Sequence, residues 1–505
     1  MRLPHIARRL GGLPRLALVG GLALSVGCNT DEIVDVQDPA ALRPEELENA
    51  GAVPALVAGA LRQFVGGYSG FGGDAFLSAS AVITDETYYG DTFPTREAGD
   101  KRTVQTPALG NISDAAFNRL MQARFNSRRA FAVVERFESD AAVAANADRH
   151  RARLRTIEGY VYVTISEGWC SAVPFSRMPD TGPIDPATIE YGESLNLDQM
   201  SDTAVARFNE ALTHLADTLA MVGKGRALLN KGEFTAAAAA VANVPTDWVF
   251  HLEHSVNTGT ENNPAAALQQ NGRYGVSNLE GGLTATGTAL RSDLNTHPLT
   301  APSAEGLPFR ALRDPRVSWM ARPDNNGRCF SSSIFCWRNN NYNALDADVP
   351  LASGVEARLI EAEAALQAGN ATLMMTKLNE LRAAAATLIP RLYPGQRQVF
   401  FNAGGGVSLD PLTDPGTGLA TPAEQFEARR ALLFRERALW MYHTGHRLGD
   451  LRRLVRDYGF TSSQVFPSGP HFRGGTYGSD VAWPVPFNEQ NNPQYNPADC
   501  VTSGA

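Results

Sequence analysis

The sequence predicts an all-α protein, a helical body interrupted by long irregular loops. Apolar residues recur at helical spacing along much of the chain, whereas the alternating pattern of half-buried strands is scarce. Four segments rich in Gly, Asn, Thr and Pro lack such spacing: 66–106, 257–308, 324–349 and 404–419. Segments of that length inside a compact protein are either disordered or functional. Because several carry aromatic residues, we expect ordered loops that present a surface.

The N-terminus has the features of a secretory signal peptide over residues 1–27. Four arginines precede a short apolar run, "LALVGGLALSVG", which stops at Cys28. The Gly27-Cys28 junction favours a lipoprotein signal in which Cys28 is acylated, and an ordinary cleavable signal is the alternative. Residues 28–40 then form an acidic tether, and 41–505 form the main domain. No second apolar run approaches the ~20 residues that a membrane-spanning helix needs.

The charge of the chain is acidic, with a net value of −8. Without residues 1–27 it keeps 41 basic and 53 acidic side chains. Binding to nucleic acid requires clustered positive charge, so we expect no nucleic-acid partner. The balance fits a body that is held at a membrane surface by lipid.

Residues 44–67 and 201–223 are the first two predicted helices. The first has acids in its first turn and glycines at its end, as the helix dipole favours. The second places apolar residues on one stripe opposite its acids, which predicts a buried face. That stripe consists of Ala204, Phe208, Ala211, Leu215 and Leu219.

Residues 421–442 carry the clearest helix start. Thr421 stands at the N-cap, Pro422 follows it, and Glu424 completes a capping box. Apolar residues then recur every seven positions and predict a buried seam: Phe426, Leu433 and Trp440.

Two segments, 225–244 and 361–383, each predict two helices joined by a glycine turn. Gly232 and Gly369 stand where the first helix of each pair ends, and alanines nearby permit close contact. The pattern resembles tetratricopeptide-type hairpins, with two unrelated αα-hairpins as the alternative. Such hairpins bury their apolar faces against neighbours.

Four cysteines follow Cys28, an even number that suits an oxidising compartment. Cys329 and Cys336 flank "FSSSIF", a short loop that a disulfide would close, and Cys170 and Cys500 would then remain as a pair. Sequence does not determine this connectivity, and four free thiols are the alternative. None of the four has the C-x-x-C or Cys/His spacing of a zinc or redox site.

The stretch "ERALWMYHTGHRLGDLRRL", residues 436–454, is dense enough in charge to suggest an active centre, a metal site or a helix end. His443 and His446 lack a third ligand, and Gly445 is predicted to end the helix between them, so we expect no metal and no cofactor. The arginines could clamp an anion, but structural ion pairs at a helix end are the favoured interpretation. The residues involved are Glu436, Arg437, Arg447, Asp450, Arg452 and Arg453.

Catalytic motifs are absent from the sequence, and we expect no enzyme and no catalytic residue. It contains no G-x-S-x-G, no Walker loop and no Rossmann fingerprint in a strand-to-helix context. Asp85 and Glu86 are the best candidates for paired carboxylates, and adjacent acids on a flexible segment are usually solvated.

Aromatic residues in the loops are more informative. Tyr88 and Tyr89 share a loop with Phe93, and Trp337 and Tyr342 share another. A ring face packs against the C–H face of a sugar or against a peptide side chain, so these four Tyr and Trp residues are the predicted ligand contacts. The alternative is that the rings pack inward and stabilise their own loops.

Taken in order, several motifs resemble the SusD/RagB family of bacterial nutrient-binding lipoproteins. They are "VQDPAAL", "ISEGWCSAVPFS", "ALLNKGEFTAAAAAV", "VPTDWVF", "DPRV", "LIEAEAALQAGN", the 436–454 stretch and "WPVPFNEQNNPQYNP". The chain departs from the family at Trp440 and Thr444, where glutamates are common. The likeness spans most of the mature chain, and it implies a SusD-like helical body with tetratricopeptide-like hairpins.

The resemblance also implies a location and a function. The protein would be anchored through Cys28 on the outer membrane, facing the exterior. It would capture glycan or peptide oligomers and deliver them to a SusC-type TonB-dependent transporter, without cleaving them. The loops that hold Tyr88, Tyr89 and Trp337 are similar in position to ligand-contacting regions of the family. Alternatives are a tetratricopeptide-like scaffold lipoprotein that organises envelope proteins and, less favoured, a secreted glycoside hydrolase.

Overall fold

The computed structural model describes residues 48–505, except 71–73, 85, 105–109, 279–306 and 402–404. The expected signal peptide (1–27), the lipidation site Cys28 and the acidic tether (28–40) therefore lie outside the described residues. Within those residues, no helix combines the length and the apolar character needed to cross a bilayer.

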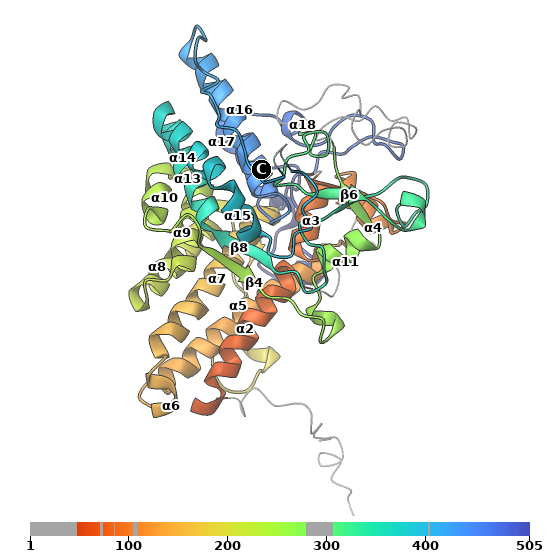
Figure 1. Cartoon of the computed structure of the whole chain (residues 1–505). Helices are drawn as coiled ribbons and strands as arrows, with labels where there is room; N and C mark the ends of the chain where they lie inside the picture. The colour runs from red at the N-terminus through yellow and green to blue at the C-terminus, as the bar shows by residue number, and fades with distance from the viewer. Residues whose placement is uncertain (1–47, 71–73, 85, 105–109, 279–306, 402–404) are drawn as a thin grey trace, which may run out of the picture. The chain divides into compact units, whose positions relative to one another are not determined.

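Helices dominate the described part of the chain, and the prediction of an all-α body with long irregular loops is confirmed (Figure 1). The longer helices are α2 (Val53–Tyr68), α3 (Phe76–Ile83), α5 (Asp114–Arg136), α7 (Ala147–Gly168), α8 (Leu197–His214), α9 (Thr218–Asn230), α10 (Phe234–Val241), α13 (Gly354–Gln367), α14 (Ala371–Ala383), α15 (Ala385–Leu392), α16 (Pro422–Trp440) and α17 (Arg447–Tyr458). Shorter ones are α4 (Pro94–Asp100), α6 (Ala141–Ala144), α11 (Pro264–Gln270) and α18 (Ser462–Val465).

The strands of the described residues are short and pair only as antiparallel two-stranded ribbons. In the ribbon formed by residues 249–252 and 349–353, the register shifts at a bulge between Phe250 and His251. The pairs are β1 (Thr87–Tyr89) with β5 (Tyr274–Val276), β2 (Val173–Pro174) with β3 (Ser194–Leu195), β4 (Val249–Leu252) with β8 (Val349–Ser353), and β6 (Trp319–Ala321) with β7 (Trp337–Asn339).

Both predicted hairpins are present, as α9–α10 and α13–α14. Gly232 and Gly369 form the turns with φ of +73° and +69°, the left-handed region that glycine adopts without a Cβ clash. Helix α13 packs against both α9 and α10, so the two hairpins lie side by side (Figure 1). A Cβ at Gly225 would lie 2.5 Å from Val241 Cγ1, which shows how closely α9 and α10 approach.

The predicted helix over 201–223 is instead two helices, α8 and α9. The chain breaks between them because Asp217 caps α9, its carboxylate accepting a hydrogen bond from the Leu219 amide at 3.1 Å. Leu215 falls in the break and is 43% exposed, although the stripe placed it in the core.

The first predicted helix, 44–67, is also shifted. Helix α2 begins at Val53 with Pro54 in its first turn, and it continues through Gly66 and Gly67 to Tyr68. These glycines do not end the helix because α5 packs against them. A Cβ at Gly67 would lie 2.9 Å from Leu120 Cγ, so the glycine permits close contact.

The segment 66–106, predicted as a loop, contains α3, β1 and α4. All eight residues of α3 are buried. A helix that is buried on every side has no polar face, so it lacks the periodicity by which helices are recognised in sequence.

The start of α16 is as predicted. The Thr421 hydroxyl accepts from the Glu424 amide at 3.2 Å, and the Glu424 carboxylate accepts from the Thr421 amide at 2.9 Å. The helix ends at Trp440, earlier than the Gly445 end that was predicted. His443 and Gly445 both adopt positive φ in the turn that leads to α17.

Arg437, Asp450 and Arg453 form the expected ion pairs in the interior, whereas Arg452 donates to the carbonyls of Ser166, Glu167 and Trp169. Arg437 and Arg453 bind Asp450 at 2.8 and 3.0 Å, and Arg453 also binds Glu363 at 2.9 Å. Burial alone would raise the pKa of Asp450, but the two arginines hold it well below its usual range. Glu436 pairs with two arginines from outside the stretch, Arg316 and Arg382, at 2.6 and 2.9 Å.

The two histidines of this stretch are buried parts of the same interior. Burial lowers the pKa of His443 to about 3, so its ring is neutral, and Nδ1 lies 2.9 Å from the side-chain nitrogen Nδ2 of Asn339. His446 lies 2.9 Å from Arg226 and 3.2 Å from Glu356. Across the described residues, no cluster of three or more His, Cys, Asp or Glu could hold a metal ion.

Candidate functional site

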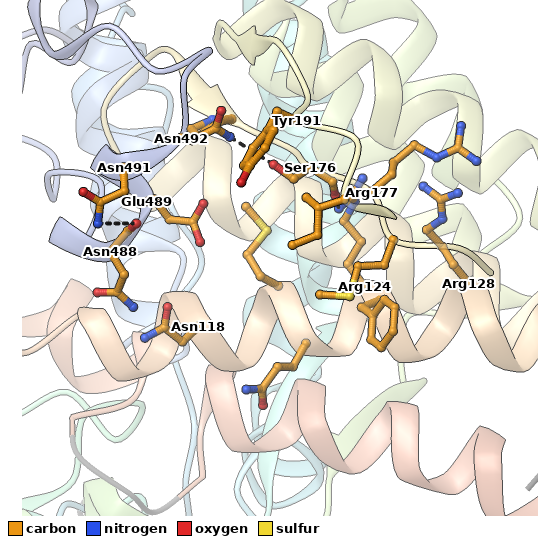
Figure 2. Close-up of a pocket in the computed structure, with 16 residues that line it drawn as sticks. Asn118, Arg124, Arg128, Ser176, Arg177, Tyr191, Asn488, Glu489, Asn491 and Asn492 are labelled. Carbon is orange, nitrogen blue, oxygen red and sulfur yellow. Dashed lines mark hydrogen bonds between the residues drawn. The ribbon is translucent and has the colours of Figure 1, made fainter. Parts of the chain in front are cut away.

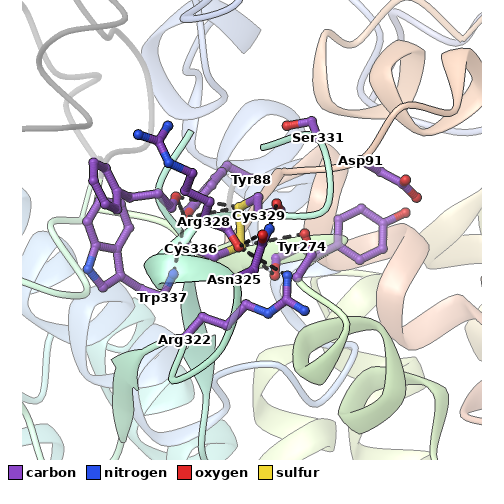
Figure 3. The surroundings of a disulfide bond; sticks show 12 residues. Tyr88, Asp91, Tyr274, Arg322, Asn325, Arg328, Cys329, Ser331, Cys336 and Trp337 are labelled. Atoms are coloured by element: carbon purple, nitrogen blue, oxygen red, sulfur yellow. Dashed lines mark hydrogen bonds between the residues drawn. A yellow bond between two sulfur atoms is a disulfide. The ribbon is translucent and has the colours of Figure 1, made fainter. Parts of the chain in front are cut away.

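The two loops that were expected near a ligand meet in the structure. Strands β1 and β5 pair with Tyr88 opposite Gly275. Beyond β1, the Gly90 amide donates to the Arg273 carbonyl at 2.8 Å, and the Ser331 amide donates to the Gly90 carbonyl at 2.9 Å. Residues 87–90, 272–276 and 329–331 therefore form one hydrogen-bonded unit around the disulfide loop (Figure 3).

Each of the four later cysteines is in a disulfide. Cys329 is bonded to Cys336, which closes the "FSSSIF" loop, and Cys170 is bonded to Cys500, 330 residues away. The small disulfide loop packs directly on Gly90. A Cβ at Gly90 would lie 2.5 Å from Cys329 Sγ and 2.9 Å from the Gly272 carbonyl, so only glycine permits this contact.

The structure corrects the expectation that the four predicted rings face outward. Tyr88, Tyr89, Trp337 and Tyr342 are 3%, 0%, 3% and 2% exposed. A loop with few aliphatic residues uses its rings as a core, and the sequence pattern is the same whether the ring points inward or outward.

Specific contacts fix these rings inside. The Tyr88 hydroxyl donates to the Phe335 carbonyl at 2.8 Å, and the Tyr342 hydroxyl donates to the His443 carbonyl at 2.8 Å. The guanidinium of Arg310 lies 3.7 Å from the ring centre of Trp337. The rings therefore support the loops and do not offer a free face to a ligand in this conformation.

Phe93 and Phe330 are the large apolar side chains that these loops do expose, at 51% and 45%. The guanidinium of Arg273 lies 4.1 Å from the ring centre of Phe330 and 5.4 Å from that of Phe93. Arg96 lies 5.2 Å from the Phe93 ring centre. We call this group, Phe93, Arg96, Arg273 and Phe330, the Phe93–Phe330 surface.

Two buried carboxylates hold the arginines of this surface in place. Asp91 accepts hydrogen bonds from Arg96 and, at 2.8 Å, from Arg273. Asp74 binds Arg96 at 2.9 Å and accepts from the Tyr274 hydroxyl at 2.8 Å. Burial raises the pKa of Asp74, and the charge of Arg96 opposes that rise. The two guanidinium groups are thus held in fixed positions.

The surface can bind without chemistry. Flat ring edges and faces contact apolar C–H groups, guanidinium N–H groups donate to hydroxyl or carbonyl oxygens, and serine hydroxyls of the disulfide loop add donors and acceptors. The sequence analysis placed Phe93 in the same loop as Tyr88 and Tyr89 but did not predict it as a ligand contact. It did not consider Phe330. A loop of eight residues closed by a disulfide is too small to bury a phenylalanine ring within itself. That size is the sequence signal that could have identified Phe330 as exposed.

The predicted acid pair does not form a site in the described structure. Asp85 lies outside the described residues. Glu86 is 1% exposed, and its carboxylate accepts from the His443 amide at 2.8 Å. It is a buried structural group, whereas the sequence predicted a solvated one.

Comparison with known proteins gives a match at the level of structure alone. No protein-family model matches the chain, and no curated protein does. A SusD superfamily protein from Bacteroides thetaiotaomicron superposes with a TM-score of 0.57, over 89% of this chain and 99% of that one, at 13% identity.

The chain has a SusD-like fold. A SusD-like carbohydrate binding protein from Bacteroides vulgatus superposes with a TM-score of 0.51, over 80% of this chain and 83% of that one, at 13% identity. NanU from Bacteroides fragilis superposes with a TM-score of 0.52, over 91% and 98%, also at 13% identity.

Proposed function

We propose that the chain is a cell-surface lipoprotein that captures nutrient oligomers, glycan or peptide, and delivers them to a SusC-type TonB-dependent transporter. The observation that carries the proposal is the Phe93–Phe330 surface, two exposed rings set around a fixed guanidinium on a SusD-like fold. Its work is capture, not cleavage. The lipoprotein-type start with Cys28 supports anchorage at the outer membrane, facing the exterior.

The binding role is tested by a panel of oligosaccharides and peptides titrated into the purified full-length chain by calorimetry. Stacking on one ring is worth about 1 kcal/mol, so we expect Phe93→Ala and Phe330→Ala each to weaken binding roughly fivefold. Leu373→Ala is the matched control, because it removes an apolar side chain 41% exposed on α14. Unchanged affinity in both phenylalanine variants would reject this surface as the site.

The same panel separates capture from catalysis. Chromatography of each mixture after long incubation should recover the oligomers intact. Release of shorter products by the purified chain would show that the protein is an enzyme and would reject the proposal.

The scaffold role is a second candidate, because the four predicted rings are buried and the two hairpins stack. It predicts that no small oligomer binds and that several envelope proteins are retained. Cross-linking in intact cells followed by purification of the chain distinguishes the two. A TonB-dependent barrel as the main product supports delivery, whereas a set of other envelope proteins supports the scaffold. Cys28→Ala should release the chain from the membrane fraction.

A further inference from the structure

A separate pocket lies between α5, residues 174–191, which begin at the end of β2, and the 3₁₀ helix η7 (Phe487–Asn491) (Figure 2). Its volume is about 590 Å³, within the range of roughly 300–1,000 Å³ typical of small-molecule sites. It shares no lining residue with the Phe93–Phe330 surface.

One end of the pocket carries a buried cation without an acidic partner. Arg124 is 6% exposed, and its guanidinium donates to the Tyr162 hydroxyl at 2.9 Å and to the carbonyls of Ser176 at 2.9 Å and Phe175 at 3.4 Å. None of its partners in the described residues is a carboxylate. These neutral acceptors solvate the guanidinium but do not cancel its charge, so the pocket wall is positive there.

Two further arginines strengthen that charge. Arg128 binds Asp180 through two hydrogen bonds, at 2.9 and 3.1 Å. Arg177 is 54% exposed and lies 3.6 Å from the same Asp180 and 4.0 Å from Glu190. Since three guanidiniums, including Arg124, lie near two carboxylates, this end keeps a positive excess.

The other end is polar but not cationic. Figure 2 shows the asparagines of η7 and its flank at this end with Glu489, and shows Tyr191 and Ser176 between the two ends. Burial raises the pKa of Glu489, so its carboxyl group holds a proton more readily than usual. Tyr191 is 52% exposed and offers an open ring. The carboxamides here belong to Asn118, Asn488, Asn491 and Asn492.

We propose that this pocket is a second binding site, for an oligosaccharide that bears a carboxylate. The carboxylate binds at Arg124 and Arg177, a sugar ring packs on Tyr191, and hydroxyls bond the carboxamides. The inference goes beyond the proposed function and does not depend on the Phe93–Phe330 surface.

A peptide fits this pocket less well than a sugar. An extended peptide gains affinity from backbone hydrogen bonds to a free strand edge. The strand at the pocket, β2, has two residues, and one of them is Pro174, which has no N–H to donate. Side-chain amides and hydroxyls supply most of the available hydrogen-bonding groups, which suits a polyhydroxylated ligand.

The test compares trigalacturonate with its carboxyl-reduced, neutral counterpart by calorimetry on the full-length chain. We expect the acid to bind at least tenfold more tightly, because charge-assisted hydrogen bonds to arginine are about twice as strong as neutral ones. Arg177→Gln and Tyr191→Ala should each weaken the acid roughly five- to tenfold, and Arg177→Lys should retain part of the affinity.

Controls separate this site from the first one. Arg391→Gln removes an arginine that is likewise 54% exposed but lies on α15, and it should leave binding unchanged. The double variant Phe93→Ala/Phe330→Ala should also bind trigalacturonate as the wild type does. Its behaviour towards the oligomer panel therefore tests the proposed function independently.

Four results would overturn the inference. They are no binding of trigalacturonate at millimolar concentration, equal binding of the reduced trimer, full affinity in both pocket variants, and equally tight binding of trialanine through its terminal carboxylate. Because Arg177 and Tyr191 are more than half exposed, their variants should fold, and thermal melting checks this.

Discussion

Replacing Asp450 by Asn tests whether the charged stretch 436–454 is architecture. Asp450 is 1% exposed, and its partners Arg437 and Arg453 are each 2% exposed. Asparagine keeps the shape but removes the negative charge, so two buried guanidiniums lose an ion-pair partner. Removing one partner of a buried pair typically costs about 3–5 kcal/mol.

The remaining contacts place the expected cost at the lower end of that range. Arg453 still binds Glu363 at 2.9 Å, and Arg437 still lies 3.7 Å from the same carboxylate. We therefore expect a loss of about 3 kcal/mol in the free energy of unfolding. Asp247→Asn is the control: Asp247 and Arg391 are 56% and 54% exposed, and such surface pairs contribute less than about 1 kcal/mol.

Denaturation in urea, monitored by circular dichroism at several pH values, measures both changes. The pKa of Asp450 is lower in the folded protein, so its charge stabilises the fold above the unfolded pKa of about 4. The difference between wild type and Asp450→Asn should be full at pH 7 and should shrink as the pH falls below about 4. An Asp450→Asn protein as stable as wild type at pH 7, yet defective in binding, would refute a structural role.

Three further predictions concern the loops. Trp337→Ala should lower the free energy of unfolding by about 3–5 kcal/mol, seen as a lower melting temperature, because the ring is buried; a variant as stable as wild type would contradict that burial. Gly90→Ala should weaken oligomer binding, because its Cβ would lie 2.5 Å from Cys329 Sγ and displace the disulfide loop. Far-ultraviolet circular dichroism should stay native. Unchanged binding would show that the disulfide loop can move aside. Cys329→Ser/Cys336→Ser should cost about 2.5 kcal/mol of stability in urea, from the loop-closure entropy of a small ring, and no loss would argue against that disulfide.

Local sequence rules worked where a pattern is complete within one segment. The capping box at Thr421 and Glu424 and the glycine turns at Gly232 and Gly369 depend on neighbours three or four residues away, so sequence reasoning found them. The same rules missed α3, whose eight buried residues show no polar face. The same rules predicted one continuous helix across Asp217, because the apolar stripe continues there. The N-cap at Asp217 instead starts a new helix.

The candidate site was predicted by region and not by residue. The loops around Tyr88 and Trp337 do meet, but Phe93 and Phe330 are the rings that reach solvent. The pocket beside α5 was not predicted, because residues 118–128, 174–191 and 488–492 that line it are far apart in the chain. Only the folded chain brings Arg124 to the wall of a cavity that Tyr191 and the C-terminal asparagines complete.

By itself the sequence determined the helical class, the two hairpins, the acidic charge and the expectation of a lipid-anchored, SusD-like binding protein. The helical class, the hairpins and the charge follow from local spacing and composition, which folding does not alter, whereas the SusD-like expectation follows from the resemblance of several motifs to that family. The tertiary structure decided which aromatic rings are exposed, that the charged 436–454 stretch lies in the interior, and where cavities form. Those outcomes depend on contacts between segments that are distant in the sequence. The identity of a residue does not reveal whether its side chain is buried by such contacts or exposed to a ligand.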